Sequence, residues 1–284
     1  MTTIVAPNER NGMKSARSGK RRWIGAGLAV VVLAIVAFVV AQGGGSGGGP
    51  LDAIAKAAEV TQREPGGRAT IEAVVTVSNS PEGITETGSM IFDETGLARG
   101  TMTVKGDSNG KEAQLVVIAD GARSYVSSDQ FESLPEGKKW MELDFAAAAG
   151  KELSSSPTDG GPQEGLKVLE AVHDAEEVGK EDIGGVPTTH YTGTLPTSNE
   201  VFGVKVHYSA PQVEVWIDAK DRVRRMHVVV SGSVGEEEET STTEMTMNFV
   251  SFGRVPKINL PNPEEVFDAT SEVESNIRSA AEGN

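Results

Sequence analysis

Side chains that commonly carry catalysis are few and scattered in this chain of 284 residues. The four histidines, His173, His190, His207 and His227, include no pair spaced four residues apart, and no HExxH pattern occurs. The chain has no cysteine and no GxSxG, Walker or GxGxxG motif. His190 and His227 fall in predicted strands, where we expect packing or cross-strand roles. The residues therefore predict a protein that is not an enzyme.

The acidic residues do not predict a metal site. Glu236 to Glu239 could hold a divalent cation weakly, but the run lacks the spaced oxygen ligands and central glycine of a calcium loop. We expect no metal and no cofactor. After residue 22 the chain has 20 basic and 40 acidic side chains, a formal net charge of −20. That charge makes nucleic acid and anionic membrane surfaces poor partners, and its simplest explanation is solubility outside the cell.

Although catalytic groups are scarce in this chain, apolar residues are plentiful in its predicted strands. Several predicted strands are apolar on both faces, among them Met90 to Phe92, Leu115 to Ile118 and Val228 to Val230, although a sheet with one wet face should alternate. Six of the eight methionines fall in predicted strands, and methionine adapts to irregular apolar shapes. Two interpretations stay open: an ordinary core, or an apolar cavity that accepts an acyl or isoprenoid chain. The candidate cavity residues are Val75, Val77, Met90, Phe92, Met102, Leu115, Val117, Met226, Val228, Met245, Met247 and Phe249.

The segment from Trp23 to Ala41 carries no charge and determines the compartment. At ~1.5 Å rise per residue, a helix of this length covers the roughly 30 Å hydrocarbon core of a bilayer. Basic residues precede it, which predicts a cytoplasmic N-terminus and an extracytoplasmic C-terminal domain. The alternative is a cleaved secretory signal with a weak cleavage site at Val40 to Gln42, but signal cores are usually only ~7–15 residues long. We expect a single-pass anchor in the cell membrane; cleavage would give a secreted protein.

These landmarks predict five parts. Residues 1–22 form a basic cytoplasmic tail, and residues 23–41 form a transmembrane helix or signal anchor. Residues 42–50 form a Gly/Ser linker, whose flexible run would span roughly 15 Å. Residues 51–268 form one extracytoplasmic domain that is large enough to bury a core without disulfides. Residues 269–284 form a polar tail that we expect to be flexible.

The extracytoplasmic domain is predicted to be α+β and mainly β. A helix over 51–62 comes first, with Pro50 in a favoured first-turn position. A second helix is predicted over 166–179, because Leu166, Leu169 and Val172 share a helical face. Alternating residues and short turns elsewhere predict an antiparallel meander and later hairpins. The predicted strands are 69–78, 85–92, 97–104, 112–119, 122–128, 138–143, 189–195, 212–218, 223–232 and 240–252.

Three later segments carry a resemblance to a known family. They are VGKEDIGGVPTTHYTGTL, VEVWIDAKDRVRRMHV and MTMNFVSFGRVPKINLPNPEEVFD, and they follow the helix and meander in this order. The order resembles that of the LppX/LprAFG lipoproteins of mycobacteria and relatives, which are similar to the LolA and LolB lipoprotein carriers. The residues that carry the resemblance are Gly185, Thr189, His190, Tyr191, Trp216, Asp218, Arg225, Phe252, Gly253, Val255, Ile258 and Pro261.

The resemblance implies a LolA-like, half-open antiparallel β-barrel of about 9–11 strands with two or three helices at its mouth. Its concave apolar face would hold acyl or isoprenoid chains of a lipid, glycolipid or lipoglycan for transport or presentation in the cell envelope. Family members typically carry a lipidated cysteine, and here the segment 23–41 stands in its place. We expect a monomer. The alternatives are an envelope sensor or regulator that binds a protein or lipoprotein, and a structural or cell-wall-binding module with a solid core.

Overall fold

The computed structural model describes most of the predicted extracytoplasmic domain. The described residues are 49–77, 80–106, 112–121, 123–131, 134–144, 162–195, 198–201, 204–234, 240–272 and 275. The predicted cytoplasmic tail, the predicted anchor at 23–41, most of the linker and the acidic run Glu236 to Glu239 lie outside them. Among the described residues, no helix combines the length and the apolarity needed to cross a membrane.

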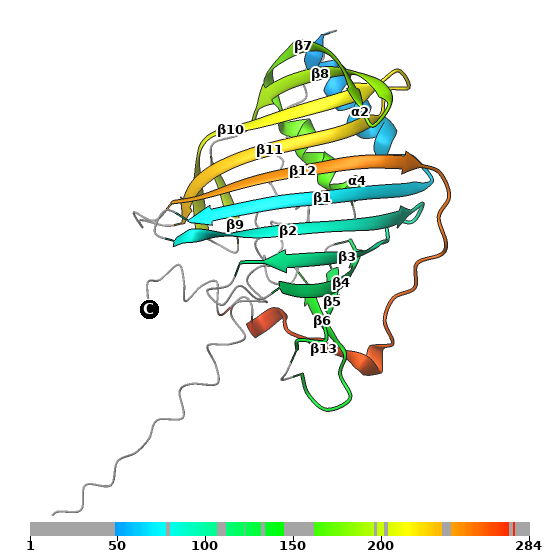
Figure 1. Cartoon of the computed structure of the whole chain (residues 1–284), viewed down its shortest axis with the longest axis vertical. Coiled ribbons are helices and arrows are strands. Elements are labelled where there is room, and N and C mark those ends of the chain that lie inside the picture. Colours follow the sequence, from blue (N-terminus) through cyan, green and yellow to red (C-terminus); the bar gives the residue numbers. More distant parts are fainter. Residues whose placement is uncertain are drawn as a thin grey trace, which may run out of the picture.

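Thirteen strands form one sheet, with few and short helices beside it (Figure 1). The described elements are α2 (Pro50–Gln62), β1 (Gly66–Val77), β2 (Ser80–Asp93), β3 (Ala98–Lys105), β4 (Glu112–Asp120), β5 (Arg123–Ser127), β6 (Trp140–Asp144), α4 (Pro162–Gly165), η3 (Leu166–Ala171), β7 (His173–Ile183), β8 (Val186–Thr194), β9 (Ser198–Val201), β10 (Val204–Asp218), β11 (Val223–Val234), β12 (Thr240–Phe252), η4 (Pro263–Glu265) and β13 (Val266–Asp268).

The sheet is open. Its strands lie in the order β13-β6-β5-β4-β3-β2-β1-β12-β11-β10-β8-β7, and β9 pairs with β10 outside this path. Strands β7 and β13 are its ends, and no pairing between these two is present in the described part of the chain. Every pairing is antiparallel except that of β13 with β6. The predicted mainly β, unclosed sheet is confirmed, whereas thirteen strands exceed the predicted 9–11.

The helix predicted over 166–179 is wrong beyond its first turns. Residues Leu166–Ala171 form the 3-10 helix η3, and β7 begins at His173. β7 lies at the edge of the sheet, where most of its side chains are exposed, so its sequence lacks strand alternation. The turn after β7 contains Gly184 and Gly185, both with positive φ, a conformation that glycine adopts without strain. Pairing with β8 therefore outweighs a weak local helical preference. Strands β9 and β13 and the first half of β10 were also absent from the prediction.

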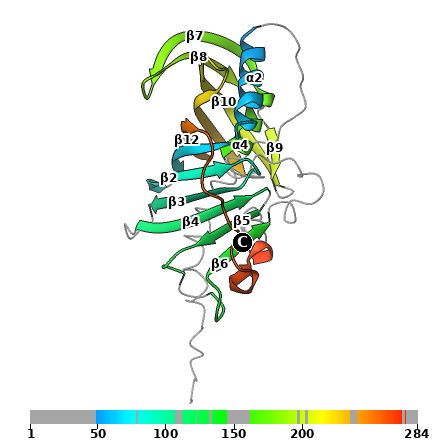
Figure 2. The same cartoon turned by 90° about the vertical axis from the view of Figure 1, so that its right-hand side faces the viewer.

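Helix α2 lies against one face of the sheet, which we call the inner face (Figure 2). Ile54, Ala57 and Ala58 of α2 are buried, and they pack with η3 and with inner residues of β1, β10, β11 and β12. Proline at the start of the helix and spaced small apolar residues explain why this segment forms a helix that packs closely.

A chain segment after β12 covers part of the opposite, outer face. It runs from Gly253 past η4 to β13, beside the strands β2 to β6 (Figure 1). Ile258 and Val266 of this segment pack on outer residues Ile118, Tyr125 and Trp140. The outer apolar residues of β2 and β4 are thus buried beneath the C-terminal segment, which explains why these strands are apolar on both faces. The predicted boundary at 268 stays a prediction, although Ala269 and Thr270 are buried.

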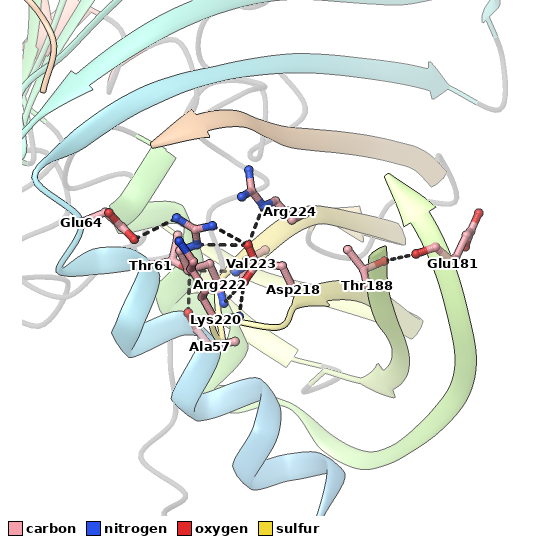
Figure 3. A network of polar contacts seen from close by, with 10 residues as sticks. All are labelled: Ala57, Thr61, Glu64, Glu181, Thr188, Asp218, Lys220, Arg222, Val223 and Arg224. Atoms are coloured by element: carbon pink, nitrogen blue, oxygen red, sulfur yellow. Dashed lines mark hydrogen bonds and ion pairs between the residues drawn. The ribbon is translucent and has the colours of Figure 1, made fainter. Parts of the chain in front are cut away.

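A polar cluster around Asp218 fixes the end of α2 to the β10–β11 hairpin (Figure 3). Thr61 Oγ1 donates to the carbonyl of Ala57 and accepts from the amide of Val223 at 2.8 Å. Asp218 Oδ2 accepts from Arg222 Nε at 3.0 Å, Arg222 Nη2 at 2.8 Å and Arg224 Nε at 2.8 Å. Both guanidinium groups also stack over the ring of Phe252. Thr61 therefore links α2 to the hairpin, and the two arginines that Asp218 holds link the hairpin to the end of β12.

The charge of Asp218 is favoured in this cluster. Burial raises the pKa of the Asp218 carboxyl, but hydrogen bonds from Arg222 and Arg224 outweigh burial and hold the pKa below its ordinary value. A carboxyl with a lowered pKa in the folded state stabilises the fold at neutral pH, and this contribution is lost as the pH falls through that pKa.

We expect Asp218→Asn to lower the free energy of unfolding by about 2–4 kcal/mol at pH 7, because the half-buried Arg222 and the buried Arg224 lose their anion. Asp221→Asn is the matched control: its ion pair with Lys56 is exposed and should cost less than about 1 kcal/mol. Urea unfolding measures both values. Below about pH 4 the D218N deficit should shrink, because wild-type Asp218 itself becomes protonated. Equal deficits in the two variants would contradict this account.

We expect Ile258→Ala to lower the free energy of unfolding by about 2–4 kcal/mol through the cavity it leaves under the C-terminal segment. Ile258 is 2% exposed, whereas Leu260 is 45% exposed, so Leu260→Ala should change stability by less than about 0.5 kcal/mol. Urea unfolding of the two variants compares them, and an I258A value as small as that of L260A would show that the segment is not anchored there.

Candidate functional site

The strand register gathers the predicted apolar residues on the inner face. Residues directly opposite each other in antiparallel strands lie on the same face. One row across six strands is Met226, Met247, Ile71, Gly88, Met102 and Leu115. The next row on one side is Val228, Met245, Ala73, Glu86, Val104 and Ala113. On the other side, a row runs through Phe249, Ala69, Met90, Gly100, Val117, Val126 and Met141.

Of the candidate cavity residues, all but Val77 have described side chains on this inner face. The buried ones are Val75, Phe92, Met102, Leu115, Met226, Val228, Met247 and Phe249, and the half-buried ones are Met90, Val117 and Met245. The side chain of Val77 lies outside the described part of the structure. The register thus places on one face residues that are up to 174 positions apart in the sequence, Val75 and Phe249. Whether they bind a ligand stays a prediction.

The inner face carries two apolar clusters. The first contains α2, η3 and the inner residues of β1, β10, β11 and β12. The second contains Met102, Leu115, Val126, Met141 and Leu143 from β3 to β6, together with Ala269. No residue of α2 or η3 belongs to this second cluster. The described helices therefore cover one part of the inner face and leave the other to short C-terminal and loop residues, including Phe267 and Phe131.

Small residues lie where the two clusters adjoin. Gly88 stands in the row between Ile71 and Met102, and Gly100 stands between Met90 and Val117. A Cβ atom at Gly88 would lie 2.8 Å from the carbonyl oxygen of Thr101, and one at Gly100 would lie 2.5 Å from that of Ser89. Only glycine fits such close backbone approaches. The inner face therefore lacks side chains at two neighbouring positions of β2 and β3.

Glu86 is the unexpected member of this face. It lies beside Ala73 on β1 and Val104 on β3, and it is 0% exposed. Neither carboxyl oxygen has a hydrogen-bond partner among the residues that the structure describes. Burial away from water raises the pKa of the Glu86 carboxyl to about 8. On the inner face of β12 and β1 to β6, Glu86 is the one ionisable residue among the side chains that the structure describes.

Sequence reasoning missed Glu86 as a candidate, although a signal was present. In the predicted strand over 85–92, Glu86 shares its parity with Met90 and Phe92, which were both assigned to the cavity. Period-two alternation places all three on one face. The sequence pattern therefore already indicated an ionisable side chain on the same strand face as Met90 and Phe92.

The outer face of the other half of the sheet carries an ordered polar row. His190 stacks on Trp216 with ring centroids 4.2 Å apart, and Arg225 lies over the other side of that ring. Trp216 Nε1 donates to Glu181 Oε2 at 2.7 Å, and Arg225 Nε donates to Asn248 Oδ1 at 2.7 Å. His227 Nδ1 lies 2.9 Å from the hydroxyl of Thr246. The prediction that His190 and His227 are strand residues with cross-strand roles is confirmed.

The chain is similar to known proteins in sequence and in structure. A model of the LppX_LprAFG lipoprotein family matches residues 52–252. A 31.2 kDa protein of Streptomyces griseus, encoded in the rplA–rplJ intergenic region, is 23% identical over 155 residues, which cover 46% of this chain and 48% of that protein. The chain spans about half the length of the curated relatives that it matches.

Two solved structures are similar at low identity. The crystal structure of the lipoprotein LppX of Mycobacterium tuberculosis is 18% identical with a TM-score of 0.41, covering 74% of this chain and 97% of that one. The crystal structure of LprF from Mycobacterium bovis is 13% identical with a TM-score of 0.40, covering 78% and 99%.

We expect the stability of the wild-type protein to fall, relative to Glu86→Gln, as the pH rises from about 5 to 8. In the unfolded chain Glu86 ionises near 4.5, whereas in the folded protein it stays protonated up to about 8, so ionisation favours the unfolded chain over this interval. The difference between the two free energies of unfolding should change by an amount on the order of 4 kcal/mol. Urea unfolding at stepped pH measures it. Glu72→Gln, an exposed carboxyl on the outer face, is the control, and parallel pH profiles for E86Q and wild type would refute the prediction.

Proposed function

The chain belongs to the LppX_LprAFG lipoprotein family, and from this we propose that it is an extracytoplasmic binding protein for lipids. Its inner face would hold the acyl or isoprenoid chains of a lipid, glycolipid or lipoglycan for transport or presentation in the cell envelope. The role is one of binding rather than catalysis. In this proposal His190 and His227 stabilise the sheet, His190 by stacking on Trp216 and His227 by its hydrogen bond with Thr246.

The inner face is the observation that carries this proposal. Apolar side chains from β1 to β6, β11 and β12 lie on one side of a single open sheet. Methionines at 90, 102, 226, 245 and 247 recur in these rows, and their flexible side chains can repack around chains of irregular shape. Burial of each CH₂ group contributes about 0.8 kcal/mol, so that half of a C16 chain already supplies about 6 kcal/mol.

The position of the domain in the cell is the second part of the proposal. The apolar segment 23–41 would hold the protein in the membrane, with the basic tail inside and the sheet outside. A Gly/Ser linker that spans roughly 15 Å would keep the sheet near the bilayer. Such a tether favours local capture or hand-off of a lipid over shuttling across the envelope. We propose that the tethered protein acts as a monomer.

Native mass spectrometry of the full chain, released from detergent micelles, tests the function. We expect lipid to remain bound to the protein purified from membranes, and a delipidated sample to take up a fluorescent fatty-acyl probe saturably. A lipid-free mass together with no uptake of the probe would refute the proposal. A stoichiometric protein partner on a lipid-free chain would favour a sensor instead.

We expect Met245→Trp to weaken binding of the acyl probe roughly tenfold, because the indole would displace about two methylene groups at ~0.8 kcal/mol each. Thr246→Trp is the matched control, since the adjacent residue of β12 points to the outer face, where Thr246 contacts His227. T246W should bind the probe as wild type does. Fluorescence titration measures both affinities, and equal losses in the two variants would show that the probe does not use the inner face.

A further inference from the structure

The described contacts give no structural reason for a glutamate at position 86. A buried carboxyl without a hydrogen bond destabilises a fold, and native proteins rarely keep one. Its cross-strand neighbours Ala73 and Val104 offer no polar atom from their side chains. By contrast the other buried carboxyl, that of Asp218, accepts five hydrogen bonds. Glu86 therefore resembles a group that waits for a partner from outside the chain.

Its surroundings are suited to such a partner. Glu86 lies between the two apolar clusters. The next position of β2 on the same face is Gly88, which has no side chain. Ala73 is small, the flexible Met245 lies beyond it in the same row, and the flexible Met102 lies beside Gly88 in the adjoining row. Because Glu86 is 0% exposed, a ligand would reach it by pushing these side chains aside, and its chains would then lie on an apolar surface on both sides of the carboxyl.

We propose that Glu86 donates a hydrogen bond to an ester carbonyl of an acylated ligand whose hydrocarbon chains lie on the two inner-face clusters. This inference rests on the proposed lipid-binding function and names the chemical class of ligand for that site.

The chemistry of the carboxyl favours an ester. Since burial raises the pKa of Glu86 to about 8, the group is mostly a neutral acid at pH 7 and can donate its proton in a hydrogen bond. An ester carbonyl is uncharged and accepts such a bond without bringing a second charge into the apolar interior. It also lies directly beside the acyl chains, so chains and carbonyl can be bound together. A hydrocarbon or ether lipid of equal length offers no carbonyl.

The test uses the full chain and two matched probes. Deuterated 1,2-dipalmitoylglycerol and deuterated 1,2-dihexadecylglycerol have chains of the same length and differ by the two ester carbonyls. They compete for the delipidated protein at pH 7, and native mass spectrometry from micelles reads the ratio of the two complexes. We expect wild type to prefer the diester about tenfold, the equivalent of one buried hydrogen bond.

Three variants separate recognition from folding. Glu86→Leu should lose the preference, giving a ratio near one, while it binds the diether at least as well as wild type does. Glu86→Gln keeps a donor and should retain most of the preference. Glu72→Leu makes the same change on the outer face of β1, where Glu72 is exposed, and should leave the ratio unchanged. Thermal melting checks that each variant folds, and E86L should melt higher than wild type, because a buried unpaired acid is replaced by an apolar side chain.

The outcomes distinguish the two proposals. If wild type binds both probes without preference, or if folded E86L keeps the wild-type ratio, the role of Glu86 is refuted while lipid binding stands. If wild type binds neither probe, the proposed function itself fails. If E86L does not fold, the ratio for wild type and for E86Q still decides, because a ratio near one in wild type refutes the inference.

Discussion

Burial of one apolar face across a wide, open sheet is the constraint on which the rest of this fold depends. Successive side chains of a strand point to opposite faces, so the rows through Met226, Met247, Ile71 and Met102 commit one whole face to an apolar environment. A closed barrel would bury that face against itself. In this open sheet α2 and η3 bury one part, and the second cluster depends on short loop and C-terminal residues.

The same constraint explains the two devices that join distant parts of the chain. α2 must stay on the inner face, and the Asp218 cluster holds its end to the β10–β11 hairpin through Arg222 and Thr61. The C-terminal segment must cover the apolar outer residues of β2 to β6, and it ends as the parallel strand β13 beside β6. Both devices thus fix to the sheet segments that lie far from their partners in the sequence.

Local patterns predicted most strands well, because alternation and short turns are properties of neighbouring residues. β12 was predicted over 240–252, as observed, and β4 and β11 to within two residues. The family resemblance marked residues that turn out to support the fold: Trp216 and Arg225 lie in the outer polar row, Asp218 binds two arginines, and Ile258 is buried against the outer face of the sheet. β7, β9 and β13 were not predictable in this way, since each is an edge or short strand defined by its partner.

The candidate site was predictable in its apolar members and not in its polar one. Parity within a strand relates Met90 to Phe92 and Met245 to Met247, whereas the register between strands shows that Met90, Met102 and Met245 share one face. Glu86 breaks the local rule, because a strand that only had to be stable would carry an apolar residue there. Violations of this kind are expected at functional positions, and in the role that we propose Glu86 would add a polar contact to an apolar binding surface.

The central claim is that acyl chains lie on the inner face. Photo-crosslinking tests it most directly: a lipid that carries a diazirine in its acyl chain is bound by the full chain in membranes, irradiated and mapped by peptide mass spectrometry. The account predicts labels on inner residues of β11 and β12, above all Met226, Met245 and Met247, and their loss when unlabelled lipid competes. Labels confined to the segment 23–41 or to outer residues such as Val250, which is 59% exposed, would contradict it.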